Sequence, residues 1–226
     1  NGASTLIKKM RATGTIENYG NHTLKVHDAV RALGLQHLNM MAPDIVNNAL
    51  LALKDLLIES LHQTRDTSRF SLLIQIYIKL NDVITLIGLS GEELFYEMGI
   101  TVDIMASLKE ATASESMEPI HKFWALDGLV FSQLKDGASE QMAQLLEAME
   151  ALLTEHEFGY QERAAYTIKQ MIFLSEKGDL SEVQRLADEA RPGIPDEEHA
   201  RIFDYTYAIA LWKLKRYIRR LFLRIW

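Results

Sequence analysis

The 226-residue chain contains no cysteine. Disulfide bonds and thiolate metal sites are therefore excluded. The absence is compatible with a reducing compartment, and we expect a cytoplasmic protein. Long uninterrupted apolar runs are also missing. The densest apolar stretch, residues 70–89, is interrupted by Gln75, Lys79, Asn81 and Asp82, which predicts a buried helix rather than a membrane span.

Proline is rare, with four in the chain, and the alternation of β-branched residues that marks strands is scarce. Leu, Ala, Glu, Lys and Met are abundant, which favours an all-α protein. Hydrophobic residues make up 48% of the sequence, enough for one substantial core or for a quasi-linear helical array with a continuous core. The chain begins at Asn1, and residues 1–5 do not read as the start of a signal peptide. We expect a fragment, a processed form or a chain without its first residues.

Motifs that carry chemistry are absent as well. The sequence holds no GxSxG, Walker or GxGxxG motif, and none of its seven histidines has HExxH spacing. The five-residue spacing of His22 and His27 does not place both rings on one helical face. Adjacent carboxylates such as Glu92 and Glu93 do not face one another on a helix either. We therefore expect no enzyme, no metal site and no cofactor.

Charge is unevenly distributed along the chain. The net charge is −7, which argues against nucleic acid as a partner of the whole protein. Residues 212–226 nevertheless carry six cations and no acid. Three interpretations stay open: a last helix docked by its apolar face, a segment that binds a membrane surface or a partner that clasps helices, or an occupant of an apolar groove in the same or a neighbouring molecule. The cations of this basic tail that lie mostly on one helical face are Lys213, Arg216, Arg220 and Arg224.

Apolar spacing and capping residues predict mainly helices. In the first half we expect a short helix over residues 6–12 and a loop over 13–22. Further helices are expected over 22–33, with Gly34 as C-cap, over 43–66, from 67 or 68 to about 89, from Ser90 to Gly99, and over 101–111. In the second half, short connectors separate helices expected at 118–135, 138–155, 160–177, 180–191 and 196–217.

The second half also resembles itself. A shift of 42 residues aligns Trp124 with Tyr166 and Ser139 with Ser181. Self-similarity at a fixed period is typical of solenoids, whose repeated units stack side by side. The alternative is an irregular helical bundle, because amphipathic helices match one another by chance.

A turn near residue 178 carries a more specific pattern. Gly178-Asp179-Leu180 is followed by small or apolar residues at helical spacing and then by Pro195. The pattern resembles the second half of a tetratricopeptide (TPR) unit, and the resemblance covers about residues 115–217. It implies an all-α fold of right-handed stacked helical hairpins, an α-solenoid of about 9–11 helices. The expected regions are an N-terminal helical region 1–113, TPR-like hairpins 114–217 and a basic aromatic segment 218–226.

In TPR arrays the first helix of each unit lines a concave groove. The resemblance therefore implies a groove lined mostly by apolar residues, unless these residues are core. It implies a non-enzymatic protein-interaction scaffold that binds a peptide or helix of a partner. One alternative is a peptide-sensing domain of a bacterial-type regulator, and another is a membrane-associated adaptor attached through residues 212–226. The expected partner-binding residues are Ile168, Ile172, Tyr205, Ile209 and Trp212; the same groove also includes Ala165, Ser175, Glu176, Ile202 and Lys213.

Overall fold

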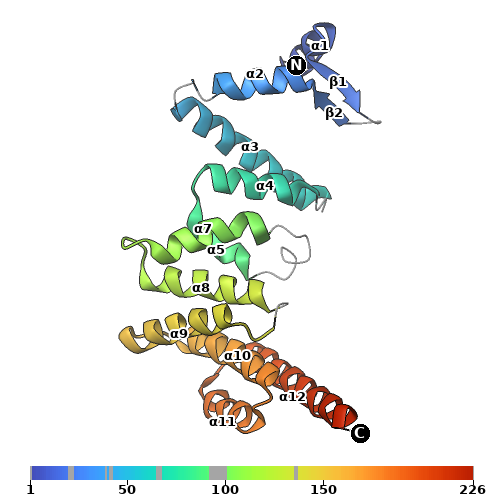
Figure 1. The fold of residues 1–226 in the computed structure, drawn as a ribbon. Coiled ribbons are helices and arrows are strands. Elements are labelled where there is room, and N and C mark those ends of the chain that lie inside the picture. Colours follow the sequence, from blue (N-terminus) through green and yellow to red (C-terminus); the bar gives the residue numbers. More distant parts are fainter. Residues whose placement is uncertain are drawn as a thin grey trace. The chain divides into compact units, whose positions relative to one another are not determined.

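In the computed structural model (Figure 1), the described part of the chain is all-α apart from one small β-hairpin. The structure describes residues 2–19, 23–38, 40, 43–64, 68–91, 101–134 and 137–225, although not every side chain within these ranges. The chain divides into two compact units, Asn1–Arg65 and Asp66–Trp226, and each is described by itself. The regional boundary expected after residue 113 falls inside the second unit.

The first unit combines helices with the hairpin. Its two strands pair antiparallel, with Ile16 opposite Val26 and Tyr19 opposite Thr23. Among its described side chains, Ile16, Leu57 and Leu61 are the buried ones. The elements of this unit are α1 (Gly2–Ala12), β1 (Ile16–Tyr19), β2 (Thr23–Val26), α2 (Asp28–Leu38) and α3 (Pro43–Thr64).

Two sequence-based expectations were wrong here. The loop over 13–22 and the helix from residue 22 are replaced by the hairpin, and α2 begins only at Asp28. Gly34, expected as a C-cap, lies within α2. Each strand is four residues long, and only the second, Thr-Leu-Lys-Val, alternates polar and apolar residues. So short a signal is easily read as part of a loop or a helical pattern.

The second unit begins with α4 (Ser68–Lys79) and α5 (Val83–Ser90), where one helix to about Leu89 was expected. Asn81 breaks the helix with φ +53°, a left-handed conformation that asparagine tolerates better than most residues. Asp82 then caps α5 by accepting the backbone N–H of Thr85 at 3.2 Å. The helix expected from Ser90 to Gly99 lies mostly outside the described residues. α7 (Thr101–Ala113) follows.

The remaining helices confirm the expected ranges within two residues, except that the last helix ends at Ile225 and not at residue 217 as expected. Pro119 stands in the first turn of α8, as its fixed φ favours. Gly178 ends α10 with φ +84°, and Asp179 caps α11 by accepting the N–H of Glu182. The elements are α8 (Pro119–Gln133), α9 (Glu140–Glu155), α10 (Tyr160–Lys177), α11 (Leu180–Ala190), the 3₁₀ turn η1 (Arg191–Gly193) and α12 (Glu197–Ile225).

α10 is the centre of the packing in this part of the chain, because it contacts α8, α9, α11 and α12 (Figure 1). Two groups of buried side chains lie on its two sides. The first, from α8, α9 and α10, comprises Phe123, Leu126, Val130, Met142, Leu146, Met149, Tyr166 and Phe173. The second, from α10, α11, α12 and the link between η1 and α12, comprises Met171, Val183, Ala187, Ile194, Ala200, Phe203, Ala210 and Leu214.

Candidate docking face

The start of α12 is fixed by local polar contacts. Oδ1 of Asp196 accepts the backbone N–H of His199 at 2.9 Å and lies 2.7 Å from Nδ1 of its ring. The backbone bond, followed by the ring contact, holds the pKa of the Asp196 carboxyl below its usual value. Arg191 of η1 donates from Nε and Nη2 to the carboxylate of Asp204, at 2.7 and 3.1 Å. α12 is thus held to the turn that precedes it by two parallel charge-assisted bonds.

α12 presents apolar residues on two faces. Phe203, Ala210 and Leu214 are buried in the second group of core side chains. On another face the exposed fractions are 53% for Ile202, 69% for Tyr205 and 56% for Trp212, and Ile209 between them is half-buried. We call Ile202, Tyr205, Ile209 and Trp212 the α12 stripe. Its members follow one another at spacings of three and four residues, so they lie along one line of the helix.

The neighbouring part of α10 adds a partly apolar border to this face. Ile168 and Ile172 are half-buried, and Ile168 also packs at the edge of the second core group. Glu176 and Lys213 join the two helices through a contact of 2.7 Å between Oε1 and Nζ. Ser175, which was expected to line the groove, is instead buried, and its hydroxyl donates to the carbonyl of Ile172. The structure therefore places the α10 residues and the α12 stripe on adjacent helices that pack together.

The basic tail is only partly described. Lys213 is half-buried and paired with Glu176, and Lys215 is exposed. The side chains of Arg216, Arg220 and Arg224 lie outside the described ones, although the helix backbone continues to Ile225. Residues 218–225 of the segment expected over 218–226 therefore continue α12 without a break.

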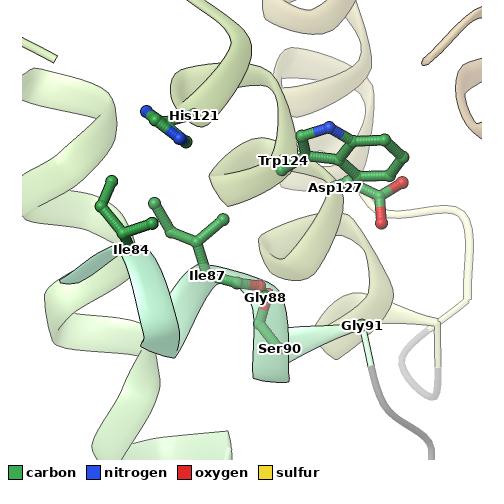
Figure 2. Close-up of a pocket in the computed structure, with 8 residues that line it drawn as sticks. All are labelled: Ile84, Ile87, Gly88, Ser90, Gly91, His121, Trp124 and Asp127. Carbon is green, nitrogen blue, oxygen red and sulfur yellow. The ribbon is translucent and has the colours of Figure 1, made fainter. Parts of the chain in front are cut away.

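A cavity of about 480 Å³ lies between α5 and α8 (Figure 2). Ile84 and Ile87 of α5 point toward the side of α8 that carries His121 and Trp124. On each helix the lining residues follow helical spacing, at positions 84, 87 and 91 and at positions 121, 124 and 127. The sequence therefore shows that each set shares one face, but not that the two helices meet. The cavity is lined by Ile84, Ile87, Gly88, Ser90, Gly91, His121, Trp124 and Asp127.

Asp127, which lines this cavity, forms an ion pair with Lys169 of α10. The side chains of Asp127 and Lys169 are 7% and 12% exposed, and Oδ1 of Asp127 lies 2.5 Å from Nζ of Lys169. The two groups are not aligned as a hydrogen bond, so this oxygen is held by charge alone. Nζ also lies 5.9 Å from the centre of the Phe131 ring. Lys169 thus supplies the counter-charge of Asp127, and Nδ1 of His121 lies 3.8 Å from Oε2 of Glu118.

α5 and α8 pack closely beside this cavity. A Cβ atom at Gly128 would overlap the side chain of Ser90 and lie 3.1 Å from Leu108. Glycine at this position therefore permits the two helices to approach. Gly88, on the cavity side of α5, has no such neighbour within 4 Å.

Among the residues that the structure describes, no group of three or more histidine, aspartate or glutamate side chains is placed to hold a metal ion. Within the same described part, none of the helices combines the length and apolar character needed to cross a membrane. His156 and Glu157 line a shallow hollow together with Glu118 and Glu162.

Comparison with protein-family models, with curated proteins and with solved structures finds no match for this chain.

Proposed function

We propose that the chain is a non-enzymatic protein-interaction scaffold that binds a helix or peptide of a protein partner on the face formed by α10 and α12. One observation carries the proposal: Ile202, Tyr205 and Trp212 are each more than half exposed along one line of α12, while the opposite side of the helix is core. Aromatic residues with exposed apolar neighbours are typical of binding hot spots. The cavity beside α5 offers no comparable chemistry.

We also propose that the second unit is built of TPR-like hairpins. In a stack of hairpins, the first helix of one hairpin contacts the first helix of the next. Here α8 contacts α10 and α10 contacts α12, in addition to the contacts within each hairpin, α8 with α9 and α10 with α11. The left-handed Gly178 and the capping Asp179 stand where the resemblance requires a tight turn. Ser139 caps α9, whereas its counterpart Ser181 lies inside α11, so the two hairpins differ at this turn. The regulatory-domain and membrane-adaptor alternatives, and the cytoplasmic location, stay predictions.

A photo-crosslinking amino acid in place of Tyr205 tests the docking proposal in a native lysate. We expect covalent protein adducts from position 205 and, in a second variant, from position 212. The matched control places the same group at Gln184, which is exposed on α11 and should give none. Tyr205→Ala with Ile209→Ala should retain the helical circular dichroism of the parent, since Tyr205 is exposed. Equal adduct yields at positions 184 and 205, or unfolding of the double variant, would contradict a docking role.

A further inference from the structure

We propose that the helix bound by the α12 stripe is the same helix of a second copy of this chain, lying antiparallel. This inference rests on the proposed docking face and names its partner. The alternating spacing of three and four residues extends beyond the stripe toward both ends of α12. It includes Glu198 on the N-terminal side and positions 216 and 219 on the C-terminal side. Such a repeat is the pattern by which two helices pack along a common seam.

The order of residues along the seam fits a twofold axis near residue 207. About this axis an antiparallel copy brings Ile202 opposite Trp212 and Tyr205 opposite Ile209. Every stripe residue then meets an apolar partner, and large side chains alternate with smaller ones. A twofold interface uses the same patch on both copies, so each pairing occurs twice.

Charge selects the antiparallel direction. Asp196, Glu197 and Glu198 lie at the start of α12, whereas the sequence after Trp212 carries only cations. In the antiparallel arrangement, Glu198 of one copy comes opposite position 216 of the other, which is arginine. A parallel arrangement would instead set acids against acids and cations against cations, and juxtaposed like charges disfavour a complex.

The residues that flank the seam differ in how well they would fit a second copy. Ala208 is small and exposed, so it permits two helices to approach closely at the centre. Farther out on the same side, Arg201 and Lys215 are both exposed, and the antiparallel register brings them near each other across the axis. This like-charge contact opposes the pairing, and its removal should therefore tighten the dimer. Lys213 lies on the other side of the seam, where it is paired with Glu176.

Sedimentation equilibrium of the full chain tests the proposal through charge reversal. We expect the parent chain to form a dimer that Tyr205→Glu with Ile209→Glu abolishes. Glu198→Arg and Arg216→Glu should each weaken dimerisation about tenfold, because every dimer contains the contact twice. The variant with both reversals should return to within about threefold of the parent. Arg201→Glu should strengthen dimerisation, by about threefold.

The matched control is Glu197→Arg. It changes the same charge in the same helical turn, away from the seam, and should leave dimerisation nearly unchanged. A chain that stays monomeric up to about 0.1 mM, above the dissociation constants expected of specific interfaces, overturns the inference. A dimer indifferent to the stripe substitutions, or single reversals without rescue by the double reversal, overturns it too.

The two proposals fail separately. If the chain is monomeric but position 205 crosslinks to another protein, the docking face stands and the second copy is not its occupant. If position 205 yields adducts with neither the chain itself nor another protein, both proposals fall.

Discussion

The two compact units bury their apolar residues to very different extents. Eight of the fourteen large hydrophobic side chains found exposed in the described part lie in the first unit, which holds only residues 1–65. On α3, Ile45, Leu53 and Leu56 are exposed although they follow helical spacing, while Leu57 is buried. In the second unit, α8 alone buries five hydrophobic residues. Helical periodicity therefore identifies a helix without showing that its apolar face has a partner.

The largest expected effect distinguishes the buried face of α12 from its exposed face. Phe203→Ala should lower the free energy of unfolding by about 3–5 kcal/mol, because it leaves a cavity in a fully packed site. Tyr205→Ala, two residues away on the exposed face, should change it by less than about 0.5 kcal/mol. Urea denaturation followed by circular dichroism measures both. Similar losses in the two variants would show that the stripe is core.

The buried ion pair should give the next effect. Lys169→Ala leaves the Asp127 carboxylate buried without its cation, and removal of one partner of such a pair costs about 3 kcal/mol or more. Asp127→Leu with Lys169→Met should restore most of the loss, since an apolar pair needs no neutralisation. Lys177→Ala, at an exposed position of the same helix that contacts the Phe173 ring, should cost less than about 1 kcal/mol. These variants are compared by thermal unfolding, and a harmless Lys169→Ala would contradict the burial of the pair.

A pair of glycine variants tests how closely α5 and α8 pack. Gly128→Ala should destabilise the second unit by about 1–3 kcal/mol, because the added methyl group overlaps Ser90. Gly88→Ala has free space and should stabilise the chain by about 0.5–1 kcal/mol through the better helix propensity of alanine. Midpoints of urea denaturation decide between them. Equal stabilisation by both would mean that the helices are farther apart than described.

In the first unit we expect smaller losses from core truncation than in the second. Leu57→Ala should cost about 2 kcal/mol, at the low end for buried leucines, because its surroundings are sparsely packed. Leu56→Ala, at an exposed neighbouring position, should cost less than about 0.5 kcal/mol. Hydrogen exchange adds a direct measure: amides of α3 should exchange faster than those of α8. Equal protection of the amides in both helices would contradict the view that the first unit is less well packed.

Capping and turn residues allowed the helix ends of the second unit to be predicted from the sequence. Pro119, Gly178 and Asp179 act within a few residues of their own positions, so the ends of α8, α10 and α11 follow from local chemistry. The break at Asn81 depends on a left-handed residue that is not glycine, and the hairpin is too short to outweigh the helical pattern around it.

The candidate site was harder to predict than the helices. α12 carries two apolar faces, and spacing alone does not tell whether Phe203 or Tyr205 faces the core, because both belong to regular patterns. The choice depends on where α10 and α11 lie, which is a tertiary property. The cavity beside His121 was missed for the same reason, since it arises only where α5 meets α8.

The ion pair between Asp127 and Lys169 also restricts how the second unit deforms. It joins α8 to α10, two helices separated in the chain by α9. Sliding one along the other by a helical turn, about 5.4 Å, would part the two charges where little water can replace either one. Motion of this region should therefore proceed by small rotations at the connecting turns, with the glycine after α10 as a pivot, and shear between alternate helices should be suppressed.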